Sequence, residues 1–535
     1  MTEAVLTGPP ANASPEDTTA VLVPAHKNWL LLGLGLSTGM EFYTNDSMNL
    51  ILPDITGTLG VSLDEASWML TVYSGALFLG VPISIWMAAH FGYKRYLIST
   101  TIVFAIASVG CAISPDLSTM LFWRAIQGFA GSGLYVWWRA SIYLLMPKPQ
   151  RSPALMRVSM LLYLSSVLGL LGSGYITDNL SWRLIFLPNL VYAVGAVWLL
   201  ARHFPHLESG PGQHAQTDYI GIGLLAAALI SLQIILSRGP IDDWFGSSFI
   251  QALAWIGVVA LALFVFWQSS PSNRSPLLHI DLLRDRNVMS SALIGMCTGV
   301  ILSGSLYALP EYLRNVDPQP HSATRTGQIM CVYALAAIAI RSFVPQLVTR
   351  LGQRRTIVFA LVMLVASMLL LSSLLTTATP DVAYLLPLIL YAFCLAPLLP
   401  AVGSGTVARI EQNKLLDGVS LYMTFRQFGA ALGVALLTIL IDRREALHSS
   451  RLFEHLRTTN PILQNWLTTT TSAVQVRGGY SVLESQNVAT RLLAEAGARQ
   501  AATLAYADAF LVMAAVGAFT LCLVPIIPPT PVAKK

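Results

Sequence analysis

Long apolar runs recur along almost the whole 535-residue chain, and this repetition is the feature that most constrains the fold. Each run is close to the roughly twenty residues that an α-helix needs to cross a bilayer. The chain is 54% hydrophobic and 11% charged, whereas an ordinary soluble domain carries about 25% charged residues. The pattern predicts an all-α polytopic membrane protein, because too little polar sequence remains for a soluble enzyme with one anchor.

The apolar windows predict fourteen transmembrane helices. Their expected spans are 28–52, 66–89, 95–113, 117–145, 155–177, 183–203, 218–237, 248–268, 289–310, 328–348, 356–376, 383–407, 419–441 and 506–528.

Basic residues gather in alternate short loops, and this asymmetry predicts the orientation of the chain. The short outer loops "PDITGTLGVSLDEA", "SPDLS" and "TTATPD" contain neither Lys nor Arg. The N-terminal tail lacks the basic n-region of a signal peptide, so we expect both termini in the cytoplasm. The net charge of +5 then orients the chain and does not indicate a nucleic-acid partner. The predicted cytoplasmic basic residues are Lys94, Arg95, Lys148, Arg151, Arg202, Arg274, Arg284, Arg286, Arg350, Arg354, Arg355, Arg409, Lys414, Lys534 and Lys535.

The sequence carries no signature of a cofactor or metal. The five cysteines all fall in apolar segments, which predicts buried thiols without a disulfide framework. No G-x-x-x-x-G-K-[ST] motif occurs, and the loops have no room for a nucleotide-binding domain. An ion gradient is therefore the expected energy source, and such a source requires a titratable group in the membrane.

Two cytoplasmic loops share a pattern that predicts an internal repeat. "MAAHFGYKR" ends in Gly92 and a basic pair, and "LVTRLGQRR" has Gly352 in the equivalent place. Coincidence is the alternative, but each loop follows the second helix of a six-helix block, as in transporters built from two related halves. The predicted regions are a disordered tail (1–27), a six-helix bundle (28–203), two inserted helices with linkers (204–287), a second bundle with a long outer loop at 442–505 (288–528) and a tail (529–535).

Several motifs together resemble the major facilitator superfamily. They are "GVPISIWMAAHFGYKR", "RAIQGFAGSG" with Arg124, Gln127 and Gly128 as R-x-x-Q-G, and "LGLLGSGYITDNLSWRLIFLPN". The fourteen helices, "NLILPDI", "RQFGAALG" and "LAYADAF" are similar to the drug:proton antiporters of EmrB/QacA type. The resemblance implies two six-helix bundles plus two inserted helices in a bacterial inner (plasma) membrane.

The chain departs from that family at four places. Ala89 and Thr349 replace the usual Asp of the two repeated loops, Tyr43 aligns with the usual acid of helix 1, and Leu170 replaces the proline of the helix 5 motif. The remaining glycines of that motif are expected to allow close helix packing, which the resemblance places between the two halves. The predicted gating and packing glycines are Gly92, Gly169, Gly172, Gly174 and Gly352.

Helix 1 carries a polar sector inside an apolar run. At 100° per residue, with Glu41 at 0°, Asn45 lies at about 40°, Asn49 at about 80° and Asp46 at about 140°. A lipid-facing helix would not keep such a sector, so we expect it to face a central cavity. Loss of water favours the protonated form of a carboxylic acid. Glu41 and Asp46 are therefore both predicted proton carriers, or one carries the proton and the other binds a cation. Structural hydrogen bonding is the alternative.

Arg124 lies well inside helix 4, where an unpaired guanidinium is costly. We expect Asp46 or Glu41 as its partner. The resemblance implies a role for Arg124 in proton transfer, and a static ion pair between helices 1 and 4 is the alternative.

Further cavity positions follow from polar and aromatic residues away from helix ends. Arg341 is expected to snorkel to the cytoplasmic surface, whereas Arg426 is weighed evenly between snorkelling and a cavity role. The predicted substrate-binding residues are Asn45, Asn49, Tyr73, Gln127, Tyr135, Arg426 and Gln427.

These features favour proton-coupled antiport of hydrophobic drugs or toxic small molecules. We expect the substrate to be either cationic or uncharged. The alternatives are a dedicated exporter of one metabolite or siderophore and, remotely, a membrane-embedded enzyme or sensor. The expected partners are protons, the lipid bilayer and the substrate. A periplasmic adaptor and an outer-membrane channel are optional partners, by the resemblance alone.

Overall fold

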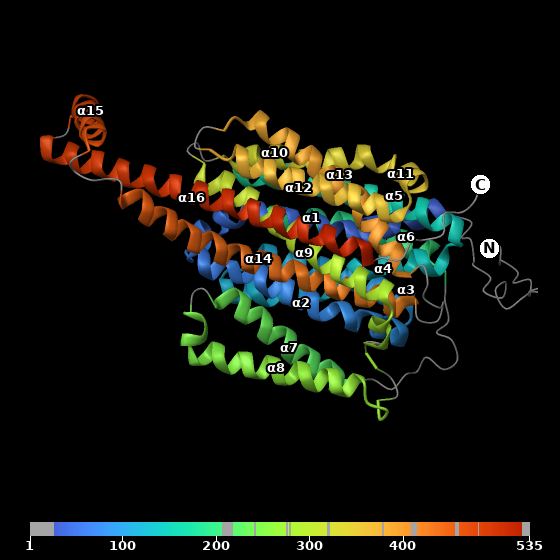
Figure 1. Ribbon diagram of the computed structural model, residues 1–535. Helices are drawn as coiled ribbons and strands as arrows, with labels where there is room; N and C mark the ends of the chain where they lie inside the picture. Colours follow the sequence, from blue (N-terminus) through green and yellow to red (C-terminus); the bar gives the residue numbers. More distant parts are fainter. Residues whose placement is uncertain are drawn as a thin grey trace, which may run out of the picture.

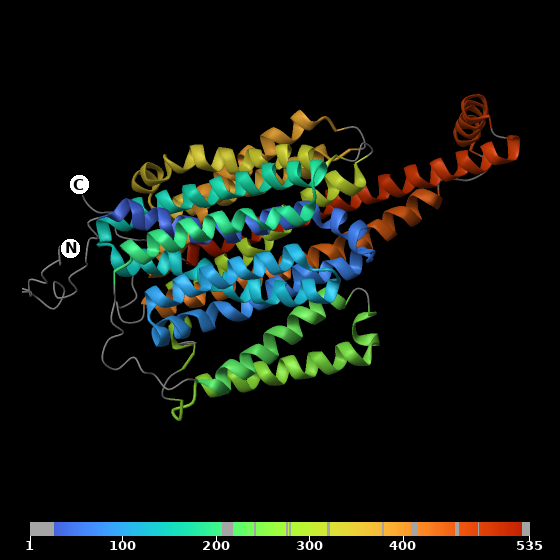
Figure 2. The same ribbon diagram turned by 180° about the vertical axis from the view of Figure 1, so that it is seen from behind.

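Every regular element that the structure describes is a helix, and most of them run side by side in one bundle (Figures 1 and 2). The computed structural model describes residues 26–205, 218–239, 242–273, 276–277, 280–317, 321–376, 379–407, 415–454, 460–479 and 481–526. Most of the predicted tail 1–27, all of 529–535, and Arg274, Arg409, Lys414, Lys534 and Lys535 lie outside these ranges.

The N-terminal part contains α1 (Lys27–Leu59), α2 (Leu63–Phe91), α3 (Tyr93–Ile113), α4 (Leu117–Leu145), α5 (Lys148–Asn179), η1 (Trp182–Phe186) and α6 (Pro188–His203). The middle part contains α7 (Tyr219–Arg238), η2 (Trp244–Gly246), α8 (Ser248–Gln268) and η3 (Ile280–Arg284). The C-terminal part contains α9 (Arg286–Glu311), η4 (Tyr312–Val316), α10 (Ala323–Arg341), α11 (Val344–Leu351), α12 (Gln353–Leu374), η5 (Asp381–Tyr384), α13 (Leu385–Val407), α14 (Leu415–Glu454), α15 (Pro461–Gly478), α16 (Val482–Leu523) and η7 (Val524–Ile526).

Twelve helices of the described ranges are long and apolar enough to cross a membrane. The helices α1 and α4 are not among them, although they have 33 and 29 residues and pack in the same bundle. Their interiors carry Glu41, Asp46, Arg124 and Arg139, which lower their hydropathy. The predicted polytopic all-α fold is confirmed, whereas the count of fourteen spans stays a prediction.

The bundle has two ends, which we call proximal, where α1 begins and α16 ends, and distal, where α14 and α16 extend outward (Figure 1). Helices α1–α6 form one group, and α9, α10, α12, α13, α14 and α16 form a second. Most helices pack mainly within their own group, whereas α10 packs more extensively on α5 than on α13. These two groups, here the N half and the C half, meet along the seams α5–α10, α2–α14 and α1–α9.

The two repeated loops contain glycines with the same left-handed backbone. Gly92 separates α2 from α3 with φ +85°, and Gly352 separates α11 from α12 with φ +79°. A residue with a side chain adopts this conformation only at a cost, so both glycines mark sharp helix breaks, in agreement with the predicted repeat. The predicted helix 328–348 is divided: α10 ends at Arg341, and α11 begins at Val344 with Pro345 in its first turn.

The α5–α10 seam is close because glycines replace side chains there. A Cβ at Gly174 would lie 2.7 Å from the carbonyl oxygen of Ala323 on α10, and one at Gly169 would lie 2.8 Å from the carbonyl oxygen of Tyr43 on α1. Gly172 faces open space, with nothing within 4 Å of an added Cβ. The expected close packing between the halves therefore holds for Gly174. Gly169 instead packs closely on α1 within the N half, and the expectation is wrong for Gly172.

Helices α7 and α8 form a pair beside α2 (Figures 1 and 2). Phe78 of α2 packs on Leu225, Leu229 and Phe264 of this pair, while much of α8 is exposed on its outer face. The ends of the pair are joined by Asp218, which precedes α7. Its carboxylate accepts hydrogen bonds from Gly221 N–H (2.7 Å) and from the side-chain nitrogens of Trp267 (2.7 Å), Gln268 (2.6 Å) and Asn273 (2.9 Å). Burial raises the pKa of Asp218, but these donors outweigh it and hold the pKa below its ordinary value.

The predicted outer loop 442–505 is largely helical. Helix α14 continues to Glu454, and α16 begins at Val482, long before the predicted span 506–528. Together with α15 they project beyond the distal end (Figure 1). The local signals are a capping box between Ser481 and Glu484 and an Asn460 cap followed by Pro461. Apolar windows miss such polar helices because they detect only the membrane-spanning part.

We expect Asp218→Ala to lower the free energy of unfolding by roughly 3 kcal/mol, because four donors lose a charged acceptor. Thermal unfolding in detergent, followed by tryptophan fluorescence, measures the change. Asp281→Ala is the matched control, since that side chain is 83% exposed. Equal melting temperatures for both variants would contradict the role of Asp218.

The seam glycines offer a second test. Gly174→Ala should lower the melting temperature, because its methyl group would meet the backbone of α10. Gly172→Ala should be neutral or slightly stabilising, since alanine is favoured over glycine inside a helix by about 1 kcal/mol. The same response from both variants would show that α5 and α10 are not packed as described.

Candidate functional site

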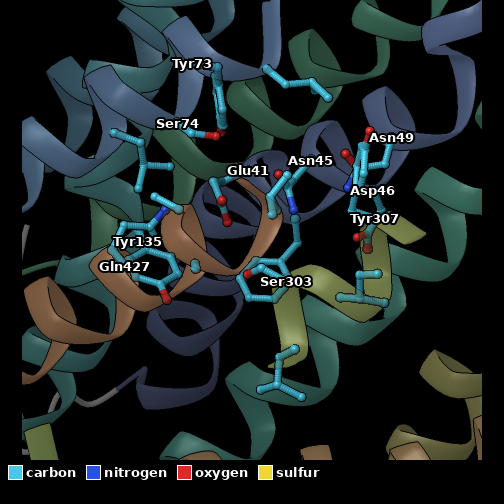
Figure 3. A pocket seen from close by; sticks show the side chains of 18 of the residues that line it. Glu41, Asn45, Asp46, Asn49, Tyr73, Ser74, Tyr135, Ser303, Tyr307 and Gln427 are labelled. Carbon is cyan, nitrogen blue, oxygen red and sulfur yellow. The ribbon is translucent and has the colours of Figure 1, made fainter. Parts of the chain in front are cut away.

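A cavity of about 290 Å³, here called the central pocket, lies between the two halves. Its wall combines α1, α2, α4 and α5 of the N half with α9, α10, α13 and α14 of the C half, and with α7. Figure 3 shows that polar side chains from several of these helices point into this space. A pocket built by both halves can change shape when one half moves relative to the other.

The polar sector of α1 lies on this wall. Glu41, Asn45, Asp46 and Asn49 all line the central pocket, and Figure 3 shows them along one stretch of it. Glu41 and Asp46 are each only 7% exposed. The structure therefore places the sector where its pattern predicts, while proton carriage stays a prediction.

The opposite wall contains α14, with Arg426 and Gln427. The guanidinium carbon of Arg426 lies 5.4 Å from the ring centre of Tyr135 on α4. Its Nε has no hydrogen-bond partner among the described residues. Arg426, Gln427 and Tyr135 therefore form a polar part of the wall that carries a cation. Of the two positions expected for Arg426, the structure shows the one in the cavity.

Arg124 lies behind the wall and has no carboxylate partner in the described part of the chain. Its Nη1 donates to Gln127 Oε1 (2.7 Å), its Nε donates to the Met69 carbonyl (3.3 Å), and its guanidinium stacks 4.1 Å from the ring centre of Tyr73. The expected pairing with Asp46 or Glu41 is therefore wrong in this conformation. A carbonyl, an amide and an aromatic face together replace the missing anion.

Gln127 is also buried away from the pocket. Its Nε2 donates to Ser108 Oγ (2.8 Å) while its Oε1 accepts from Arg124. Tyr73 is the one member of this group that reaches the pocket wall. Gln127 thus supports Arg124 and does not contact the pocket, contrary to its predicted substrate contact.

Arg341 departs from its predicted snorkelling. It is 4% exposed, lines the central pocket, and its Nη2 donates to Ser159 Oγ of α5 (2.7 Å), while its Nη1 donates to the Ala396 carbonyl of α13. The helix break before α11 directs this side chain inward, and the position at the C-terminus of α10 favours a cation. Arg341 therefore joins the N half to the C half.

Other polar lining residues are absent from the sequence predictions: Thr71, Ser74, Arg139, Ser159, Tyr163, Ser166, Gln233, Ser303, Tyr307, Tyr333 and Thr438. Arg139 has a clear signal, since it is a lone charge inside the run "VWWRASIYLL". It contacts Met423 Sδ at 3.3 Å and stacks on Trp138. The others look like ordinary helix residues, and only packing reveals which way they point.

The inserted helix α7 also contributes to the pocket. Gln233 and Leu236 lie on its wall, and an added Cβ on Gly75 of α2 would lie 3.2 Å from Gln233 Cγ. Gly75 thus lets α7 approach α2. Helix α7 is therefore part of the site as well as an addition to the bundle.

Other chemistries find little support in the described ranges. No group of three metal-ligating side chains occurs there. All five cysteines are free, but Cys522 is exposed, so the prediction of buried thiols is wrong for that residue. His448 contacts Asp508, at 2.8 Å, between α14 and α16.

The sequence is similar to those of several known proteins. The sequence model of the Major Facilitator Superfamily matches residues 34–434. The chain is 26% identical over 435 residues to "Multidrug export protein EmrB" of Escherichia coli (strain K12), covering 81% of this chain and 84% of that protein. It is also 26% identical over 437 residues to "Fatty acid resistance protein FarB" of Neisseria gonorrhoeae, covering 80% and 83%.

Solved structures agree on the fold. The crystal structure of "peptide transporter POT in complex with sulfate" superposes with a TM-score of 0.60 at 15% identity, over 93% of this chain and 94% of that one. At that identity the likeness concerns the fold alone.

The position of α7 can be tested by chemical labelling. Gln233→Cys should react about tenfold faster with a small charged methanethiosulfonate reagent than Ser231→Cys, because reactivity follows exposure. Ser231 is buried against Gly257 of α8 and serves as the matched control on the same helix. The parent protein gives the background from its native thiols. Equal protection of both cysteines would show that α7 does not line the pocket.

Proposed function

Because this chain belongs to the Major Facilitator Superfamily, we propose that it is a proton-coupled exporter of hydrophobic small molecules, with a cationic charge of the substrate left open. One observation carries the proposal: two nearly buried carboxyl groups, Glu41 and Asp46, line a pocket that both halves build. The names of relatives, among them a multidrug export protein and a fatty acid resistance protein, support efflux.

The physical logic of antiport is competition for the carboxyl groups. A buried carboxylate is costly without a counter-charge, so it binds either a proton or a cationic group of a substrate. Aromatic and aliphatic wall residues such as Tyr73, Tyr135 and Leu302 supply apolar contact for the remainder of the substrate. Alternating exposure of the pocket would then exchange an incoming proton for an outgoing molecule.

Location and direction are part of the proposal. We place the protein in a bacterial inner (plasma) membrane with the proximal end in the cytoplasm, because Lys94 and Arg95 begin α3 there and Arg354 and Arg355 begin α12. The projecting helices α14–α16 would then lie outside. Several of their apolar side chains are exposed, including Ile462 and Val476. This extension is the proposed docking region for an optional periplasmic adaptor, itself linked to an outer-membrane channel.

A dedicated metabolite or siderophore exporter is the second candidate. The observation that favours it is the set of three arginines on the pocket wall, Arg139, Arg341 and Arg426, against two carboxyl groups. Fixed guanidinium groups suit a compound with carboxylate or similar anionic groups. Such a compound would not displace protons from Glu41 and Asp46, so proton release separates the two candidates.

We expect purified protein in weakly buffered detergent to release protons when ethidium, a lipophilic cation, is added. At least one of the two variants, Glu41→Gln and Asp46→Asn, should abolish this release, because a neutral amide has no proton to exchange. Asp281→Asn is the control, since that carboxylate is exposed. Unchanged release in both pocket variants would remove α1 from the proton path. Absence of release from the parent would shift support to the second candidate.

A further inference from the structure

Tyr333 and Asp46 form a direct polar link between the two halves. The Tyr333 hydroxyl on α10 donates to Asp46 Oδ2 on α1 across 3.1 Å. Both residues line the central pocket, and both are nearly buried, at 2% and 7% exposed. A bond between residues 287 positions apart in the sequence indicates a specific contact of the folded molecule.

Helix α10 is tied to the N half at three levels. At its distal end, Asp178 of α5 accepts hydrogen bonds from Ala323 N–H (3.2 Å) and Thr324 N–H (2.7 Å). At its proximal end, Arg341 donates to Ser159 of α5. The Tyr333–Asp46 bond lies between them and is the level at which α10 meets a carboxyl group of the pocket wall.

The middle bond depends on the charge of Asp46. A hydrogen bond to a carboxylate is shorter and about twice as strong as one to a neutral acceptor. Ionised Asp46 therefore holds α10 against α1 in the described arrangement, and protonation weakens this hold. The free energy of binding a proton to Asp46 therefore differs between an arrangement with this bond and one without it. Such a difference is what a ligand needs to shift the equilibrium between two arrangements of the halves.

Tyr333 is well placed to pass this change to the rest of the C half. Its ring packs edge-to-face on Tyr391 of α13, with centroids 5.8 Å apart. The Tyr391 hydroxyl donates to the Leu302 carbonyl of α9 (3.1 Å) and accepts from Ser305 Oγ (3.3 Å). Helices α9, α10 and α13 are thereby connected behind the hydroxyl that contacts Asp46.

Other groups contribute to the surroundings of Asp46 and must be held constant in a test. Charge and hydrogen-bond interactions reach it from Glu41 on α1, Ser166 on α5, Tyr333 on α10 and Tyr391 on α13. The remaining titratable or charged residues of the pocket wall are Tyr73, Tyr135, Arg139, Tyr163, Tyr307, Arg341 and Arg426.

We infer that Tyr333 is a positioning residue that reports the protonation of Asp46 to the C half, and that this bond couples proton binding to the movement of the two halves. The inference rests on the proposed function and deepens it by naming the residue that links the proton site to the moving half.

The test is the protonation of Asp46 itself, measured by infrared difference spectroscopy on the full-length protein. The carboxylic C=O band that is absent from Asp46→Asn identifies the residue. In Tyr333→Phe the midpoint of this band should move to higher pH by about one unit, because the ionised form loses a donor; one unit is a tenfold change in proton affinity. Tyr175→Phe, an exposed tyrosine of α5, should leave it unchanged.

Transport gives a second readout that a purely structural role would not produce. In proteoliposomes, Tyr333→Phe should shift the pH profile of ethidium transport in the same direction, whereas Tyr175→Phe should leave the profile unchanged. An unshifted infrared midpoint in folded Tyr333→Phe would overturn the inference, as would a band that does not titrate in the parent. The infrared measurement needs no substrate, so failure of the proposed export would not be confused with failure of this inference.

Discussion

The cost of placing carboxyl groups inside a bilayer governs this structure. Glu41 and Asp46 lie in the middle of α1, and neither lipid nor an apolar helix can accommodate them. Polar groups from both halves surround them instead, including Tyr333, Ser166 and Arg426. The central pocket therefore stabilises the two carboxyl groups of α1. Both halves supply the polar groups that do so.

The buried side chains of Arg124 and Arg341 are stabilised without ion pairs to these carboxyl groups. Arg124 uses an amide, a carbonyl and an aromatic ring, and Arg341 uses a hydroxyl and a carbonyl. A direct ion pair between the halves does occur, but it joins Asp54 and Arg314 at the distal end, at 2.8 Å. Neither acid of the pocket forms an ion pair within the described part of the chain. This agrees with the proposed proton exchange, since a close ion pair would favour the ionised form of the acid.

Local patterns predicted much of this arrangement. Apolar runs and the shared Gly92 and Gly352 breaks indicated the helices and the repeat, because helix length and backbone conformation depend on nearby residues. The polar sector of α1 was evident from helical geometry alone. The same reasoning was wrong about the partner of Arg124, the direction of Arg341 and the surroundings of Gly172, because each depends on which helix lies opposite.

The sequence by itself determined that the chain is a polytopic helical membrane protein with acids on one face of its first helix, since periodicity and hydropathy act within a single helix. Only the tertiary structure decided that Tyr333 meets Asp46, that α7 adds Gln233 to the wall, and that Arg124 lies behind Tyr73. These contacts join segments up to 287 positions apart, and their geometry is set by how whole helices pack, which no local pattern encodes.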